Sequence, residues 1–208
     1  AAGEPFLRAE GTAAALHMAW KVSLNLCDHL SGVATKTRAI VDAAHGANPA
    51  CEVLTTRKSM PGVKDLLTKA VTCGGAFPHR LGASETVLVF DHHITFMGGF
   101  EAFLEALPAL RGRCVEKKLF VEAGPGEARC LAKAGVDGIQ LDKLPVDDLA
   151  ALVSELRAID PHLTLIAAGG INLQNAAAYA ATGVDGLATT APFTAKPIDM
   201  SVRMKRAE

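Results

Sequence analysis

The chain of 208 residues is poor in aromatic side chains and in net charge. Phe, Tyr and Trp together make up 5% of it, so the core must be built mainly from Ala, Val, Leu and Ile. The formal net charge is −1, which gives no support to general nucleic-acid binding. Half of the residues are hydrophobic, and the length suits one folded domain with a substantial core.

Cysteine is present, but in no pattern typical of a zinc site or of a disulfide framework. The cysteines are scattered and odd in number, and no C-x-x-C occurs. This usage is typical of a reducing compartment. No apolar run approaches the length that spans a membrane, and no secretory signal is recognisable. We therefore expect a cytoplasmic chain that contacts neither membrane nor nucleic acid. The five cysteines are Cys27, Cys51, Cys73, Cys114 and Cys130.

Several well-known catalytic motifs are absent as well. No G-x-G-x-x-G follows the first strand-like run, which weakens a dinucleotide-binding interpretation. Neither G-x-S-x-G nor a Walker motif occurs, so covalent acyl transfer and P-loop hydrolysis have no support in the sequence.

Short apolar runs alternate with segments of helical period over most of the chain. Such alternation predicts parallel βαβ units, and continuously apolar strands fit a sheet covered by helices. Either a barrel or an open doubly wound sheet satisfies the pattern; we predict an α/β fold, a (β/α) barrel of about six to seven parallel strands, fewer than the usual eight. The predicted strands are 51–55, 86–90, 118–122, 138–142, 163–167 and 185–189, and the helices between them are 61–72, 97–110, 125–134, 145–158 and 173–181.

The first part of the chain has a different pattern. Residues 11–30 have apolar positions at helical spacing, Ser31-Gly32 is predicted to break this helix, and a second helix is expected over 33–45. The apolar side chains of the first helix need a surface to lie on. We therefore predict an amino-terminal helical segment, 1–46, that links to a domain absent from this chain, followed by the barrel, 47–208.

A local cluster of basic groups lies beside two tight turns. Arg57 and Lys58 precede a Pro-Gly pair, and His79 and Arg80 follow a Gly-Gly pair at short range. Arginine binds carboxylates and phosphates through two parallel hydrogen bonds, and lysine acts as a point charge. His79 is also able to donate to an anion or to move a proton. This cluster predicts a site for a small polyanion, either a phosphate or a dicarboxylate.

Polar groups close nearly every predicted strand, at the end where barrels carry their chemistry. Gly169-Gly170 either brings backbone N–H groups close to a phosphate at the start of a helix near Asn172 or forms a plain tight turn. His92 and His93 are expected to be ordinary hydrogen-bonding side chains, because successive strand residues point to opposite faces. The strand-end groups in order are Arg57-Lys58, Asp91-His92-His93, Glu122, Asp142-Lys143, Gly169-Gly170 and Thr189-Thr190.

Glu122 and Asp142 end consecutive predicted strands. If those strands are neighbours, about 4.8 Å separates them. Two such carboxylates suit Mg²⁺ or the hydroxyls of a ribose. The alternative is a pair of solvated acids at the rim, each paired with a lysine.

The order and spacing of several motifs resemble the quinolinate phosphoribosyltransferase family, over roughly Gly11 to Val202. Among its members the chain looks most like the ModD branch, which is associated with molybdenum transport and regarded as pyrophosphorylases. The motifs are Ser31-Gly32-Val33-Ala34-Thr35, Thr56-Arg57-Lys58-Ser59-Met60-Pro61-Gly62, Gly74-Gly75 with His79-Arg80, Asp91-His92-His93-Ile94, Leu141-Asp142-Lys143 and Gly169-Gly170-Ile171.

The resemblance implies a reaction, an assembly and a role for each matching residue. The family moves ribose 5-phosphate from phosphoribosyl pyrophosphate (PRPP) to the nitrogen of quinolinate with Mg²⁺, releasing pyrophosphate and carbon dioxide. It implies a homodimer with shared sites and an α/β sandwich domain before the barrel. By position, Arg57, His79 and Arg80 would hold the acceptor, with Lys21 supplied across the dimer; Lys58, Gly169, Gly170 and Thr190 would meet phosphate; Glu122 and Asp142 would hold Mg²⁺ or ribose hydroxyls, and Lys58, Glu122 and Asp142 would act in catalysis.

The chain departs from the family pattern on the acceptor side. Phe90 stands where the family carries a lysine, Lys21 where it carries an arginine, and His92 and Lys143 where it carries asparagines. We therefore expect a PRPP-dependent transferase whose acceptor need not be quinolinate. The alternatives are an oxyanion-binding barrel without turnover and another phosphate-binding barrel enzyme, an isomerase or an aldolase, for which Lys143 would be the reactive lysine.

Overall fold

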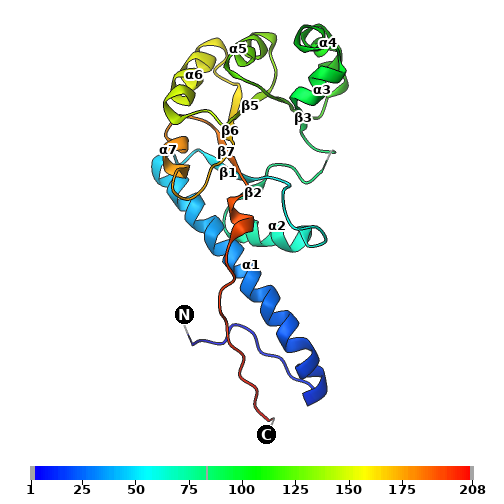
Figure 1. Ribbon diagram of the computed structural model, residues 1–208, viewed down its shortest axis with the longest axis vertical. Helices are drawn as coiled ribbons and strands as arrows, with labels where there is room; N and C mark the ends of the chain where they lie inside the picture. Colours follow the sequence, from blue (N-terminus) through cyan, green and yellow to red (C-terminus); the bar gives the residue numbers. More distant parts are fainter. Residues whose placement is uncertain (1–2, 83, 207–208) are drawn as a thin grey trace.

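The computed structural model describes residues 3–82 and 84–206, and its centre is a single sheet of parallel strands (Figure 1). The sheet has seven strands in the order β2-β1-β7-β6-β5-β4-β3, and β2 and β3 form its two open edges among the described residues. The predicted incomplete barrel is thus confirmed as a half-barrel. The strands are β1 (Glu52–Thr55), β2 (Phe77–Pro78), β3 (Val87–Val89), β4 (Leu119–Glu122), β5 (Gly138–Asp142), β6 (Thr164–Ala168) and β7 (Gly186–Thr189).

The predicted strands all form, each within one residue of its expected bounds, but the sequence pattern missed β2. This strand is only two residues long and contains Pro78. It pairs in parallel with β1, where Leu54 lies opposite Phe77 and Thr55 opposite Pro78. Proline cannot donate to a sheet, and an edge strand tolerates that loss.

Helices cover the convex side of the sheet. The five predicted barrel helices form within three residues of their expected bounds, and two short helices, α3 and η1, were not predicted. Gly135 ends α5 in the left-handed region with φ 77°, as expected for a glycine after a helix. The helices after the first are α2 (Lys64–Cys73), α3 (Asp91–Phe96), α4 (Phe100–Arg113), α5 (Pro125–Ala134), α6 (Val146–Ile159), α7 (Ala176–Ala180) and the 3₁₀ helix η1 (Ala191–Thr194).

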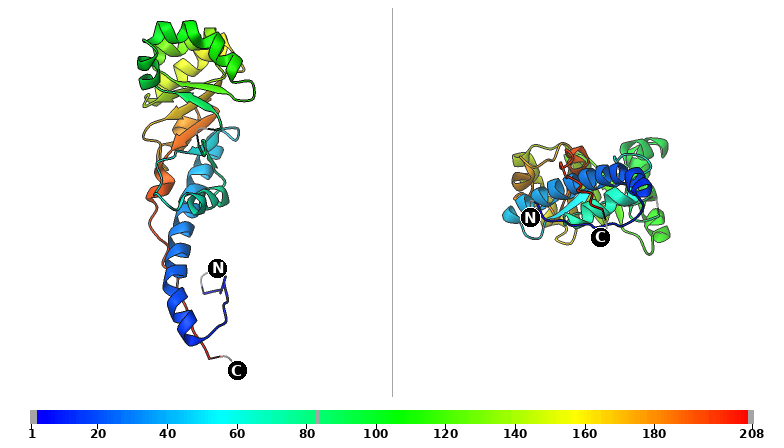
Figure 2. Two further views of the ribbon diagram at one scale, coloured as in Figure 1. Left: turned by 90° about the vertical axis from the view of Figure 1, so that its right-hand side faces the viewer. Right: turned by 90° about the horizontal axis from the view of Figure 1, so that it is seen from below.

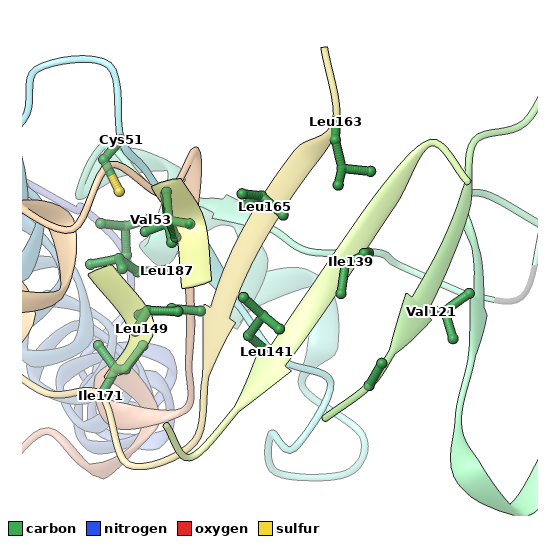
Figure 3. Packing of buried hydrophobic residues seen from close by; sticks show 14 of the residues in the cluster. Cys51, Val53, Val121, Ile139, Leu141, Leu149, Leu163, Leu165, Ile171 and Leu187 are labelled. Atoms are coloured by element: carbon green, nitrogen blue, oxygen red, sulfur yellow. The ribbon is translucent and has the colours of Figure 1, made fainter. Parts of the chain in front are cut away.

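The two faces of the sheet have different side chains. Alternate strand residues such as Val121, Ile139 and Leu165 point to the helices and form the main core (Figure 3). The opposite, concave face carries a smaller cluster made of Leu88, Phe120, Ile166, Ala168 and Ala188, with Leu54 and Phe90 packed against it.

The concave face is filled by one large ring opposite a glycine. A Cβ atom at Gly138 would overlap the ring of Phe120. The absence of a side chain at Gly138 is therefore what lets Phe120 occupy the interior of the half-barrel. The Phe120 ring and the cluster around it thus take up interior space below the strand ends.

The first helix, α1 (Ala13–Ala47), is continuous over 35 residues, so the predicted break at Ser31-Gly32 is wrong. Gly32 lies where the carboxyl-terminal segment crosses the helix, and a Cβ atom there would overlap the carbonyl oxygen of Lys196. Gly32 therefore permits a close approach of two backbones instead of ending the helix.

The two halves of α1 have different surroundings. In the second half Val33, Ile40 and Val41 are buried in the main core. The first half extends beyond the half-barrel, and the segment after η1 runs along it (Figure 2). The N–H of Ile198 donates to the carbonyl of Asp28 at 2.9 Å. The predicted domain boundary near residue 46 stays a prediction. Within the described ranges, no helix combines the length and apolar character needed to cross a membrane.

Candidate anion site at the strand ends

Alternation along the strands places several polar and aromatic side chains at the mouth of the concave face. Leu54, Leu88 and Phe120 point into the interior, so the residues two further on, Thr56, Phe90 and Glu122, face the same side. One direct contact agrees with this placement, since the hydroxyls of Thr56 and Thr190 lie 3.1 Å apart.

One wall of the mouth is basic and comes from the segments after β1 and β2. The N–H of His79 donates to the carbonyl of Thr55 at 2.9 Å, which fixes it beside the end of β1. Burial and, after it, the charges of Arg80 and Arg57 lower the pKa of His79. Burial and the charge of Arg57 also lower the pKa of Arg80. The three predicted acceptor-binding groups of this chain therefore lie close together, with His79 neutral at pH 7.

The basic groups lack acidic partners. Among the described residues, no ion pair involves Arg57, Lys58 or Arg80, whereas Arg111, Arg129 and Arg157 are each paired with a carboxylate. A group of uncompensated cations in one place is unfavourable unless an anion joins it. The arrangement therefore favours an anionic ligand.

A pocket of about 120 Å³ lies beside two of these basic groups, Arg57 and Arg80. Arg57 and Arg80 line it together with Thr56 and Lys64, over an apolar floor that includes Leu67 and Phe193. A larger hollow of about 380 Å³ lies at the opposite end of β4. Arg111 in this hollow already donates to the carboxylate of Asp137 and to the carbonyl of Gly135, so these hydrogen bonds stabilise the fold.

The opposite wall is acidic. The strands β4 and β5 are neighbours, and Glu122 lies opposite Gln140, which donates to its carboxylate at 2.5 Å. Burial is the main cause that raises the pKa of Glu122; the charge of Asp142 adds to it, and the Gln140 hydrogen bond, Lys143 and Lys58 oppose it. The two predicted carboxylates thus interact, and Lys58 lies near enough to be felt by Glu122.

Lys143 and Gly169 pack closely around Asp142 of the acidic wall. Lys143 has φ 55° and is the one non-glycine among the described residues in the left-handed region. Its ammonium lies 3.3 Å from Asp142. A Cβ atom on Gly169 would overlap the side chains of Asp142 and Lys143. Because the Lys143 side chain is exposed and ion-paired, it lacks the desolvated surroundings typical of a Schiff-base lysine.

Gly170 is open, but the helix expected beside it begins later than predicted. A Cβ atom at Gly170 would meet no atom within 4 Å, and its φ is +74°. The helix expected to begin near Asn172 forms, but it begins at Ala176, because residues 172–175 form a turn before it. Side-chain oxygens of Asn175 and Asn172 accept the N–H groups of Asn172 and Gln174. These N–H groups are therefore not free for a ligand, and Gly169, Gly170 and Thr190 remain the predicted phosphate contacts.

The third wall is aromatic, and its role was missed by reasoning from the sequence. The strand β3 ends at Val89, and His92 and His93 lie in α3. Nδ1 of His93 accepts the N–H of Phe90 at 2.9 Å, as expected for an ordinary hydrogen-bonding histidine. The rings of Phe90 and His92 are stacked with centroids 5.5 Å apart, and the guanidinium of Arg80 lies 5.6 Å from the Phe90 centroid.

Lys21 is the one predicted site residue that the structure does not bring to the mouth. It lies on the exposed first half of α1, where its ammonium is 5.4 Å from the ring of Trp20. A role for Lys21 in this site therefore requires a second copy of the chain.

The residues at the acidic wall fit a metal ion that arrives with its own phosphate ligands. Within the described ranges, no group of three or more His, Cys, Asp or Glu side chains is arranged to hold a metal. Glu122 and Asp142 supply two carboxylates, and Mg²⁺ is commonly bound by one or two carboxylates together with substrate phosphates and water. The donor set therefore fits a shared ion and not a closed protein site.

Comparison with known proteins agrees with this architecture. Residues 33–203 match the family model "Quinolinate phosphoribosyl transferase, C-terminal domain". The chain is 45% identical to the "Putative pyrophosphorylase ModD" of Rhodobacter capsulatus over 84% of its own length and 67% of that protein. It is 37% identical to the "Nicotinate-nucleotide pyrophosphorylase [carboxylating]" of Mycobacterium leprae over 91% of the chain and 65% of the relative.

Solved structures show the same relationship. The nicotinate-nucleotide pyrophosphorylase of Francisella tularensis matches 91% of this chain with a TM-score of 0.81 and 30% identity, and the chain spans 65% of it. NadC from Streptococcus pyogenes has a TM-score of 0.81 and 27% identity over 93% of this chain, which spans 66% of that protein. The chain therefore belongs to the quinolinate phosphoribosyltransferase family and corresponds to its carboxyl-terminal domain.

Proposed function

We propose that the protein transfers ribose 5-phosphate from PRPP to the ring nitrogen of a carboxylated heterocycle and releases pyrophosphate. The observation that carries the proposal is the group of basic side chains without acidic partners, Arg57, Lys58 and Arg80, beside Glu122. Such a mouth suits two anionic substrates: one part of it would bind the phosphates of PRPP, and another would bind the carboxylate of the acceptor. Names of relatives across the family, which include nicotinate-nucleotide pyrophosphorylases, support the same reaction class.

The chemistry is a displacement at the anomeric carbon of the ribose. The bond from this carbon to the pyrophosphate oxygen breaks, the pyrophosphate keeps the electron pair, and the lone pair of the acceptor nitrogen forms the new bond. The carbon gains oxocarbenium character, so the protein has to position both substrates, balance charge and exclude water. No covalent nucleophile is needed.

Each wall of the mouth has a part in this proposal. Arg57, His79 and Arg80 hold the carboxylate of the acceptor, and Lys58 meets the phosphates. Gly169, Gly170 and Thr190 take the 5-phosphate at the ends of β6 and β7. The carboxylates of the acidic wall hold ribose hydroxyls or the metal ion.

Mg²⁺ is part of the proposal because the donor set fits it. Glu122 and Asp142 would hold the ion together with the phosphates, and the ion would supply charge neutralisation for the leaving pyrophosphate.

We also propose a homodimer in which Lys21 of one subunit completes the site of the other. Lys21 lies outside the mouth of its own chain, on a projecting helix with Met18 80% exposed and Val22 63% exposed. Large apolar side chains at this exposure are typical of a surface that another chain covers. A reducing, cytoplasmic setting fits the free thiols of the five cysteines. A link to molybdenum transport rests on the likeness to the ModD branch alone.

The test is pyrophosphate release by the full-length protein with PRPP, Mg²⁺ and a panel of nitrogenous acids. Arg57→Ala should weaken acceptor binding in a calorimetric titration by roughly 30-fold or more, since losing one member of a desolvated charge pair costs about 2–5 kcal/mol. Arg129→Ala removes an exposed arginine paired with Glu155 and serves as the matched control. Equal affinity in Arg57→Ala and the control would refute the assignment.

A second candidate function is supported by the same uncompensated basic groups. A barrel that binds an oxyanion without turnover would bind PRPP or pyrophosphate and give no product with any acceptor of the panel. PRPP binding without pyrophosphate release on the full-length protein would favour it.

A further inference from the structure

The three walls of the mouth differ in what they offer to an acceptor. The wall after β1 and β2 is basic, the wall after β4 and β5 is acidic, and the wall after β3 is an aromatic group of Phe90, His92 and His93. In that group the three rings lie within 6 Å of one another, from 4.0 Å between His92 and His93 to 5.8 Å between Phe90 and His93. The basic and aromatic walls adjoin, because Arg80 belongs to the first wall and lies over Phe90 of the second.

The basic wall has its two arginines around one small pocket. The pocket has a volume of about 120 Å³, and Arg57 and Arg80 both line it. Burial and the two arginines lower the pKa of His79, so the like charges that repel each other here are those of the two guanidinium groups. One carboxylate placed between them relieves this repulsion. Lys64 also lines the pocket, but its ammonium already donates to the carbonyl of Leu81.

Phe90, the member of the aromatic wall beside Arg80, offers a second carboxylate neither a charge nor a donor. Phe90 has no donor and packs against the apolar cluster of the concave face. The ring nitrogen Nδ1 of His93 is already occupied by the N–H of Phe90, and burial, His92 and Arg80 lower the pKa of His93. A second carboxylate pressed against the Phe90 ring would lose water at a cost of several kcal/mol, because Arg80, the guanidinium beside that ring, is already engaged by the first carboxylate. An uncharged aromatic face, in contrast, gains from stacking.

We infer that the acceptor is a planar heteroaromatic acid with a single carboxylate, held by Arg57 and Arg80 with its ring against Phe90, and not a vicinal dicarboxylate. This inference rests on the proposed function and narrows its acceptor. The new bond joins the ring nitrogen to the anomeric carbon as pyrophosphate leaves. The carboxylate is retained in the product, so no carbon dioxide is released.

The test compares two acids that differ by one carboxylate, pyridine-3-carboxylate and pyridine-2,3-dicarboxylate, on the full-length protein. Equilibrium binding and PRPP-dependent pyrophosphate release are measured for both. We expect the monocarboxylate to be favoured by about tenfold or more, and Phe90→Lys to lower this ratio by about tenfold or more. Phe90→Tyr keeps the ring and should keep the preference. Phe96→Lys adds the same charge on α3 at a side chain that is 88% exposed, and should leave the ratio unchanged.

The outcomes separate the inference from the proposed function. A wild-type preference for the dicarboxylate, binding of neither acid, or an equal change of the ratio in Phe90→Lys and Phe96→Lys overturns the inference. Failure of PRPP to bind, measured by calorimetry without an acceptor, counts against the proposed function instead. If PRPP binds but neither acid is turned over, the ratio of the two equilibrium binding constants still decides the inference. Thermal unfolding of each variant confirms that it is folded.

Discussion

Single residues at the mouth are held in backbone conformations that most amino acids avoid. Gly169 and Gly170 both have φ between +70° and +90°, but only Gly169 is packed against other atoms. Gly169→Ala should lower the free energy of unfolding by about 1–3 kcal/mol through strain and further through overlap with Asp142. Gly170→Ala, which has the strain without the overlap, should cost less. Urea denaturation of the two variants measures the difference, and equal losses would contradict the packing argument.

His79 makes stability depend on pH in a defined direction. Its folded pKa lies below the ordinary value of 6.5, so the folded state binds this proton less readily than the unfolded state. The contribution of His79 to the free energy of unfolding is therefore fully present above about pH 6.5. It is lost as the pH falls through the lower pKa of the folded state. Between about pH 7.5 and 5, the wild type should lose more stability than His79→Gln. His17→Gln, at an exposed position of α1, is the control and should follow the wild type.

Much of the site could be predicted from the sequence, because polar residues at the ends of apolar strands are visible in the pattern. The contribution of Phe90 could not be seen in the same way. In the sequence, Phe90 only shows that the lysine of the family pattern is absent. Its position on the concave face depends on where β3 ends and α3 begins. The length of the turn after Gly170 could not be predicted either. The side chain of Asn175 accepts the N–H of Asn172, and the side-chain amides of both asparagines donate to the carbonyl of Gly170, so the helix starts only after them.

At the scale of whole elements, α1 shows that a glycine in a helical pattern either ends the helix or permits another segment to pack closely against it. Its period continues through Ser31-Gly32, and only the crossing segment near Lys196, far away in the sequence, reveals what the glycine is for. The edge strand β2 was missed for a related reason: two residues have no period, and only their pairing with β1 defines them.

Gly32→Ala tests this interpretation of α1. In an exposed helix the change should stabilise by roughly 1 kcal/mol, but here the new methyl group would meet the carbonyl of Lys196. We expect a loss of stability and faster proteolysis within residues 195–206. Gly46→Ala, in the same helix and with no atom within 4 Å of the added carbon, should not speed proteolysis. Equal proteolysis of the two variants would show that the crossing does not depend on Gly32.

At the scale of the whole molecule, the proposed shared site predicts complementation between inactive variants. Lys21→Ala and Arg57→Ala should each be inactive alone. A mixed and reassembled sample should recover roughly a quarter of the wild-type activity, because half of the dimers are mixed and each has one intact site. Arg57→Ala mixed with Glu122→Gln should recover none, since both residues come from the same chain. Recovery in both mixtures, or in neither, would contradict the role of Lys21 across the interface.

The open gap in the sheet has a consequence for how this enzyme family diversifies. In a closed barrel, hydrogen bonding around the full circle sets the diameter, and no opening can change without a new register. Here β2 and β3 are the two edges of the sheet; Arg80 follows the first and Phe90 follows the second. Because no hydrogen bonds join these two edges in the described residues, changes near them can alter the proposed acceptor side while the proposed phosphate side, at the ends of the paired strands β6 and β7, keeps its geometry.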